Sequence, residues 1–204
     1  MLTAAGAGVL LGLALIVPLG QQNVFVISQG VTVGLPRALL AVVGAAGCDS
    51  ILILLGAGGG SALLDRVPGL RPALLAAGSL LLVYLGVRSL RSGVVVSQVN
   101  GTVIRPRQVF ARTAAVSLLN PHAILDTVGV LGTAIAAQPA EARVFFGAGT
   151  ALASWVWFLF LVAAAALLGQ ALTPSRRVWF DRFSGVVLLG FAAFLGYELW
   201  RELT

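Results

Sequence analysis

The sequence predicts an all-α membrane protein with six transmembrane helices in two inverted three-helix repeats, the first and fourth helices being broken at prolines. Of its 204 residues, 59% are hydrophobic and only 10% are charged. A soluble globular domain carries about 25% charged residues. The apolar residues form six long stretches, and two of these contain a proline beside a short polar run. The chain is therefore predicted to lie almost entirely in a lipid bilayer.

The six apolar stretches have lengths close to the roughly 20 residues that a helix needs to cross a bilayer. In chain order they are residues 4–27, 38–58, 70–87, 110–137, 145–168 and 180–199. The first stretch has no basic residue before Pro18 and continues past the length of a signal peptide, so we expect it to be a span. Six crossings place both termini on the same side of the membrane.

The arginines indicate which side that is, because loops on the cytoplasmic side are enriched in basic residues. All 13 basic residues are Arg. Nine lie in or beside the loops between spans one and two, three and four, and five and six: Arg37, Arg88, Arg91, Arg105, Arg107, Arg112, Arg176, Arg177 and Arg182. The other side has four: Arg66, Arg71, Arg143 and Arg201. We therefore expect both termini outside the cytoplasm, in the inner membrane of a bacterium.

The chain also divides into two similar halves. Three short patterns recur in order at offsets of 103, 105 and 110 residues: proline with a polar residue five positions later, glycine with Asp or Ser five positions later, and an aromatic-Leu-Gly run ending in Arg. A repeat of three spans is odd, so its copies must have opposite orientations in the bilayer, as in many transporters. The expected units are residues 1–91, a cytoplasmic linker at 92–108, and residues 109–204.

Each proline break brings polar groups to membrane depth. Polar groups survive there only against protein or a water-filled cavity, and matched broken spans in the two halves indicate a transport site near the midplane. Proline also ends a helix and leaves a new helix N-terminus, which attracts an anion such as a carboxylate. The residues of these two breaks are Pro18, Gly20, Gln22 and Asn23 in the first half, and Asn120, Pro121 and His122 in the second.

Two aspartates are expected inside the membrane. Asp49 is in the middle of the second stretch, and Asp126 follows the Pro121 break. A charged residue at the centre of a spanning helix costs about 2.5–3.5 kcal/mol, and such residues usually mark ion or substrate pathways. The alternative interpretation is a polar residue satisfied by a neighbouring helix. Paired acids suit a cationic substrate group, a proton, or both.

Three further residues complete the predicted site. His122, the only histidine, lies four residues before Asp126 on the same helical face and could relay protons. Ser154 and Trp157 lie within the fifth stretch, where each could line a substrate path or simply pack. One His and one Cys are too few donors for a structural metal site. No phosphate-binding glycine motif is present, so we predict no metal, no cofactor and no nucleic-acid partner.

Taken together, five segments resemble the L-lysine exporter (LysE) family, in its basic-amino-acid branch. The segments are residues 18–30, Cys48-Asp49, residues 84–91, Asn120-Pro121-His122 with Asp126, and Gly147 to Phe158. They occur in five of the six stretches and in the family's order. One departure is Gln21, where many relatives have Pro. The resemblance implies export of L-lysine, L-arginine or close cationic analogues driven by the proton-motive force, with the family's paired aspartates at Asp49 and Asp126.

The predicted function is therefore a secondary transporter that exports basic amino acids by proton antiport. The alternative is an exporter of another small solute, a neutral amino acid or a metal cation, on the same fold. An intramembrane enzyme is not expected, because no nucleophile motif accompanies Ser154, His122 and Asp126. The predicted partners are the substrate, protons and the lipid bilayer, and the sequence is compatible with a homo-oligomer.

Overall fold

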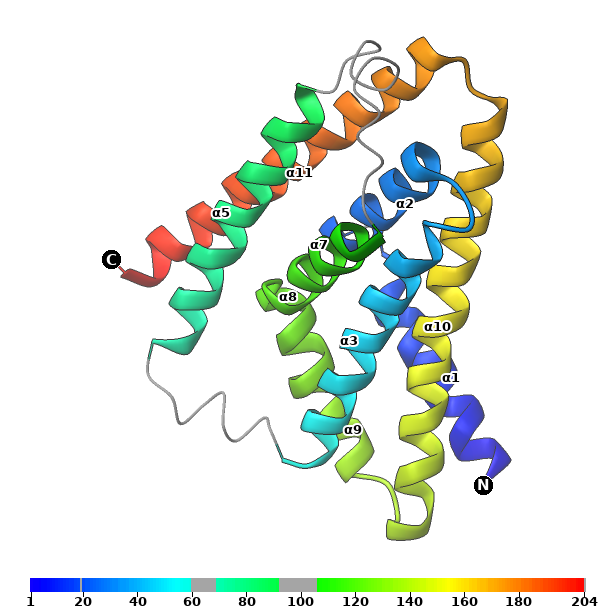
Figure 1. Cartoon of the computed structure of the whole chain (residues 1–204). Helices are drawn as coiled ribbons and strands as arrows, with labels where there is room; N and C mark the ends of the chain where they lie inside the picture. Colours follow the sequence, from blue (N-terminus) through cyan, green and yellow to red (C-terminus); the bar gives the residue numbers. More distant parts are fainter. Residues whose placement is uncertain (19, 60–68, 92–105, 204) are drawn as a thin grey trace.

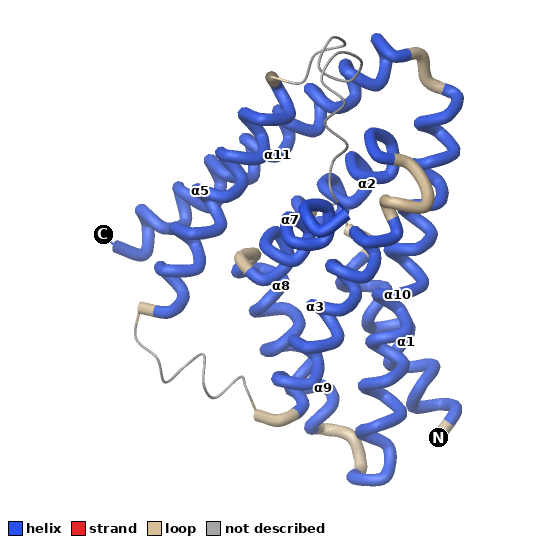
Figure 2. Tube along the Cα trace, in the orientation of Figure 1, coloured by secondary structure: helices blue, strands red, loops and turns tan. Residues whose placement is uncertain are grey.

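The computed structural model describes residues 1–18, 20–59, 69–91 and 106–203, and within these ranges every regular element is a helix (Figures 1 and 2). The elements in chain order are α1 (Leu2–Ile16), α2 (Gln21–Val33), α3 (Leu39–Ala57), α5 (Leu70–Leu90), α7 (Pro106–Leu118), α8 (Pro121–Ile124), the π-helix η1 (Leu125–Leu131), α9 (Gly132–Ala136), α10 (Ala140–Ala171) and α11 (Pro174–Leu203). The all-α prediction is confirmed for these residues.

Four of these helices, α3, α5, α10 and α11, are each long and apolar enough to cross a membrane. Two bent pairs also qualify when each is taken as one span. The helices α1 and α2 meet at 85°, and α7 meets the segment Pro121–Ala136 at 68°. The described part of the chain therefore has four to six candidate spans. The two bends fall in the first and fourth predicted spans, where the sequence predicted breaks.

Helix α10 lies at the centre of one group of packed helices. Helices α1, α2 and α3 all contact it, while α5 and α11 form a separate antiparallel pair that contacts the rest mainly through α2 (Figure 1). Helix α3 packs against α7, η1 and α9. In Figure 1 the α2–α3 and α10–α11 connections lie at the upper end of the molecule, and the N-terminus and the α9–α10 connection lie at the lower end.

The close contact between α1 and α10 depends on glycine. A Cβ on Gly8 would meet the Phe146 carbonyl, and one on Gly149 would meet the Ala5 carbonyl. Small residues permit such close backbone approach, which drives helix association in membranes where lipid and side chains are equally apolar. The sequence pattern Gly8-x-x-x-Gly12 is thus explained, because Gly12 also lies against α10 at Thr150 and Ala153.

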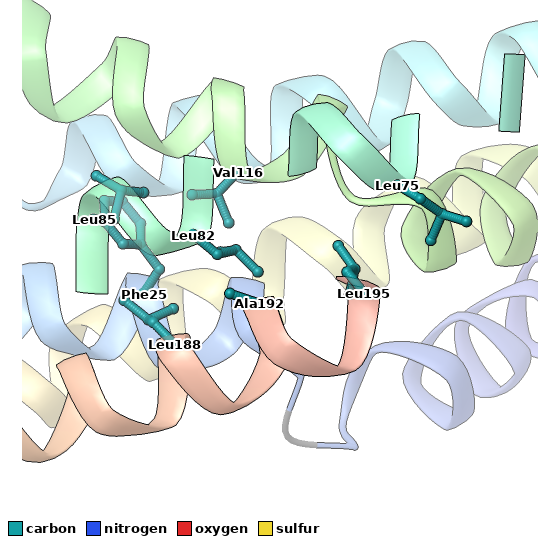
Figure 3. Close-up of a cluster of buried hydrophobic side chains, with 8 residues drawn as sticks. All are labelled: Phe25, Leu75, Leu82, Leu85, Val116, Leu188, Ala192 and Leu195. Atoms are coloured by element: carbon teal, nitrogen blue, oxygen red, sulfur yellow. The ribbon is translucent and has the colours of Figure 1, made fainter. Parts of the chain in front are cut away.

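Apolar side chains fill the spaces between the helix groups. One cluster joins α2, α5, α7 and α11 through Phe25, Leu75, Leu82, Leu85, Val116, Leu188, Ala192 and Leu195 (Figure 3). A second joins α2, α3 and α10 through buried residues that include Val26, Val42 and Phe158. Many large apolar residues stay exposed, such as Leu54, Val144 and Leu167, as expected of helix faces that contact lipid.

Some helix boundaries differ from the prediction. Helix α7 begins at Pro106, inside the predicted 92–108 linker, and residues 92–105 lie outside the described residues. Helices α10 and α11 contain 32 and 30 residues, more than the predicted stretches. At 1.5 Å per residue both exceed the roughly 30 Å hydrocarbon thickness. Such helices must tilt or extend beyond the bilayer, which hydropathy alone does not reveal.

Candidate functional site

At the first break, a polar side chain forms hydrogen bonds to backbone carbonyl groups of the break itself. Helix α1 ends at Ile16, and α2 begins after Gly20, whose backbone is extended at φ −96° and ψ 179°. Asn23 donates from Nδ2 to the carbonyls of Ile16 at 2.7 Å and Pro18 at 2.9 Å. Carbonyls that the broken helix leaves without a partner are satisfied in this way. Asn23 thus holds the bend, and its Oδ1 accepts from Trp157 Nε1 at 3.3 Å.

The second break follows a different local pattern. Asn120 is extended at φ −90° and ψ 102°, and Pro121 is the first residue of α8. A residue before proline is disfavoured in the helical region, and proline is favoured at the first helical position because it lacks an N–H. The chain then passes into the π-helix η1, which contains Asp126. Single π turns occur often at functional sites.

Asp49 is the buried acid of the site. It lies on α3 with only 6% of its surface exposed, and its Oδ1 accepts a hydrogen bond from Gln22 Nε2 at 3.2 Å. The Ser154 side chain of α10 lies beside the same carboxylate and lines the same cavity. Three helices therefore converge on one carboxyl group. A buried acid with a neutral donor, and with no basic partner among the described residues, keeps capacity to bind a cation or a proton.

A cavity of about 240 Å³ lies between the two breaks. It is smaller than the 300–1,000 Å³ of most ligand pockets, so it suits a small solute. Its walls come from α1, α2, α3, α8, η1 and α10 and comprise Gly12, Leu15, Ile16, Pro18, Gly20, Gln22, Asn23, Asp49, Ile53, Asn120, His122, Ala123, Asp126, Thr127, Leu131, Thr150 and Ser154. No Lys or Arg is among them, so the charged groups of the lining are acidic.

The structure brings most of the predicted site residues to this one cavity. Seven of the eight predicted binding residues line it, namely Gln22, Asn23, Asp49, Asn120, His122, Asp126 and Ser154. Trp157 does not, and it reaches the site only through its bond to Asn23. Pro18 and Gly20 are also in the lining, whereas Pro121 is buried beside it. Asp126 is exposed, in contrast to Asp49.

Some features of the site were not predicted. Thr127 and Thr150 line the cavity, and both are almost fully buried. The Thr150 hydroxyl donates to the Phe146 carbonyl of its own helix at 3.0 Å. Their position as polar residues inside apolar stretches is the sequence feature that could have predicted their place in the cavity. Among the described residues, no group of three or more His, Cys, Asp or Glu could hold a metal ion.

Apolar helices, two bends and an acidic cavity define an integral membrane protein of the transporter class. The LysE type translocator family model matches residues 13–199, so the chain belongs to this family. The family resemblance predicted from the sequence is thus confirmed.

Named relatives cover nearly the whole chain. The putative amino-acid transporter YisU of Bacillus subtilis (strain 168) is 37% identical over 95% of this chain and 89% of its own length. The arginine exporter protein ArgO of Pectobacterium atrosepticum is 36% identical over 95% and 97%. The putative amino-acid transporter YggA of Aeromonas salmonicida is 40% identical over 91% of each. Family and relatives are transporters rather than enzymes. No solved structure matches the chain.

Proposed function

We propose that this protein exports basic amino acids, L-arginine or L-lysine, from the cytoplasm by proton antiport. The observation that carries the proposal is the cavity between the two breaks, whose described lining holds two acids, Asp49 and Asp126, one histidine and no Lys or Arg. A pocket with two acids and no Lys or Arg in its described lining favours a substrate with an extra positive charge. A relative of similar length is named an arginine exporter.

The two ends of such a substrate find different partners. The first N–H groups of α2, from Gln21 to Asn23, precede the first intrahelical bond, which Val24 donates to the Gly20 carbonyl. These groups and the partial positive charge of a helix N-terminus favour the α-carboxylate. The Oδ1 atom of Asn120 is a buried acceptor without a partner in the described residues, and it suits an ammonium or guanidinium N–H. The side-chain cation then faces Asp49 and Asp126.

Export of a cation needs coupling. Moving one positive charge outward against an inside-negative potential costs about 2.3 kcal/mol per 100 mV. One inward proton per substrate cation cancels that charge, and a second proton adds the electrical driving force. Asp49, Asp126 and His122 all lie at the cavity and are the candidate proton carriers.

Two related sets of glycine contacts support the inverted repeat. Gly149 of α10 lies against the Ala5 carbonyl of α1, and Gly44 of α3 lies against the Phe110 carbonyl of α7. Gly149 follows Gly44 by 105 residues, and Phe110 follows Ala5 by the same number, so the two contacts pair equivalent positions of the two halves. Likewise Gly30 of α2 packs on α10, and Gly132 of α9 packs on α3. Each broken span thus contacts the second span of the other half, so the two halves share one interface, which is where transporters built from inverted repeats hold their substrate.

A competition assay on purified protein in liposomes tests the substrate assignment. Arginine and lysine should compete with labelled arginine, whereas citrulline, which lacks the side-chain charge, and agmatine, which lacks the α-carboxylate, should compete poorly. Loss of one charge-assisted hydrogen bond is worth about 1.5–3 kcal/mol, so each analogue should bind at least about 10-fold more weakly. Equal competition by citrulline would favour the alternative of a neutral amino acid. Equal competition by agmatine would remove the helix-end site for the carboxylate.

A further inference from the structure

His122 contacts the cavity and also a carboxylate outside it. The residue lies in α8, lines the cavity, and places Nε2 3.3 Å from Oε2 of Glu198 in α11. Its ring stacks on Phe194, one turn before Glu198, with centroids 5.6 Å apart and planes at 22°. Helix α11 therefore presents an aromatic face and an acid to the same imidazole. Glu198 is not part of the cavity lining.

This contact fits a group that exchanges protons better than a fixed structural pair. The Nε2 atom is buried and makes no hydrogen bond of regular geometry to a described residue, although it is within ion-pair distance of Glu198. The Glu198 side chain is 24% exposed and that of His122 is 41% exposed. Both side chains keep partial exposure, so each can still meet a second proton donor or acceptor. Glu198 is partly exposed on α11, outside the cavity lining, whereas His122 lines the cavity.

We propose that Glu198 and His122 form the proton path between the cavity and the membrane side that bears the C-terminus. Glu198 takes a proton from water at that side and passes it to His122 Nε2. The imidazolium then releases its other proton, from Nδ1, to a cavity acid. A return of the ring to its first tautomer resets the path, and no bond other than the transferred N–H and O–H bonds is made or broken. The proposal rests on the proposed proton antiport.

Other charged groups near the path must be considered in its pH dependence. The acids Asp49, on α3, and Asp126, on η1, line the same cavity as His122. On α11, Arg201 and Glu202 follow Glu198 by three and four residues. Because these groups also carry charge, only a variant of the pair itself isolates the role of Glu198 and His122.

The test compares two transport modes of the full chain in liposomes. Proton-driven transport of arginine needs net proton movement, whereas arginine–arginine exchange at equal pH needs none. Glu198→Gln should lower proton-driven transport at least about 10-fold, with the exchange rate kept within about twofold. His122→Gln should lower the proton-driven rate to a similar extent. The double variant should be no worse than either single variant, because both residues serve one path. Glu141→Gln, an exposed acid at the start of α10, is the matched control.

The outcomes separate this proposal from the proposed function. If the natural protein transports no basic amino acid in either mode, the proposed function fails. If it does, and Glu198→Gln retains full proton-driven transport from pH 5 to 8, the proton path is wrong. Loss of exchange together with proton-driven transport in Glu198→Gln would also overturn the path, because it would assign Glu198 to substrate binding or to folding. Additive losses in the double variant would place the two residues on separate routes.

Discussion

Gln22 Nε2 donates a hydrogen bond to Asp49 Oδ1 at 3.2 Å, and so joins the first turn of α2 to the middle of α3. The two residues are 27 positions apart in the chain, and both are buried. The bend between α1 and α2 is what brings Gln22 to this position. The bond orients the carboxylate of Asp49 toward a cavity that it shares with Asp126.

Replacement of Gln22 by Leu should weaken substrate binding more than it slows turnover. The change removes a hydrogen bond to a charged group, worth about 1.5–3 kcal/mol, so KM for arginine should rise about 10-fold or more. Initial rates in liposomes over a range of arginine concentrations measure it. Gln29→Leu, seven residues along the same helix and outside the cavity lining, should leave KM unchanged. An unchanged KM in Gln22→Leu would show that Asp49 needs no orienting donor.

The substitutions Asp49→Asn and Asp126→Asn should each abolish export while the protein remains inserted in the membrane. Each removes a negative charge from a cavity whose described lining holds no Lys or Arg, and with it a site for the substrate cation or proton. Efflux of labelled arginine from cells, with membrane levels from a blot, measures the effect. Asp181→Asn is the matched control, since Asp181 lies on α11 and accepts its bond from Ser89. Normal export by either cavity variant would remove that residue from the mechanism.

Asn23→Ala should destabilise the protein as well as impair transport. The change leaves the carbonyls of Ile16 and Pro18 without their donor, and an unsatisfied buried polar group costs about 1–3 kcal/mol. Thermal unfolding in detergent should show a lower midpoint. In Thr32→Ala the hydroxyl lost is one bonded to the Ser28 carbonyl within the same helix, so the midpoint should hardly move. Equal midpoints for the two variants would argue against Asn23 as the residue that holds the bend.

Two neighbouring glycines of α1 should respond in opposite ways to Ala. In Gly8→Ala the new methyl group would meet the Phe146 backbone, which cannot move freely, whereas at Gly6 nothing lies within 4 Å. Overpacking of this kind costs about 1–3 kcal/mol, while Ala in an open helical position is favoured over Gly by about 1 kcal/mol. Unfolding midpoints of the two variants give the comparison. A Gly8→Ala variant as stable as Gly6→Ala would contradict the close α1–α10 contact.

The topology predicted from the arginines can be checked at two described connections. In a Cys48→Ala background, Thr173→Cys between α10 and α11 should react with a thiol reagent only from the cytoplasm. Ala140→Cys at the start of α10 should react from outside. Both positions are exposed. The reverse pattern would invert the protein and place both termini in the cytoplasm.

The sequence by itself determined the class of the protein, its breaks and most of its cavity residues. Hydropathy reports which segments prefer lipid, and Pro18 and Pro121 mark breaks because the effect of proline is local. Asp49 and Asp126 could be singled out for the same reason, since a charge inside an apolar stretch is costly wherever the stretch packs.

Only the tertiary structure decided which groups meet. Hydropathy did not reveal that the Asn23 side chain donates its hydrogen bonds to carbonyls of its own break. Nor did it reveal that Gln22, rather than Asn23, contacts Asp49. It also gave no sign that Glu198 reaches His122, because Glu198 reads as a residue at the end of the last apolar stretch. Contacts between distant segments depend on the 85° and 68° bends and on the glycine surfaces of α1, α3 and α10. The bends and the glycine surfaces set the distance between neighbouring helices. The hydrophobic periodicity of a single helix does not predict that distance.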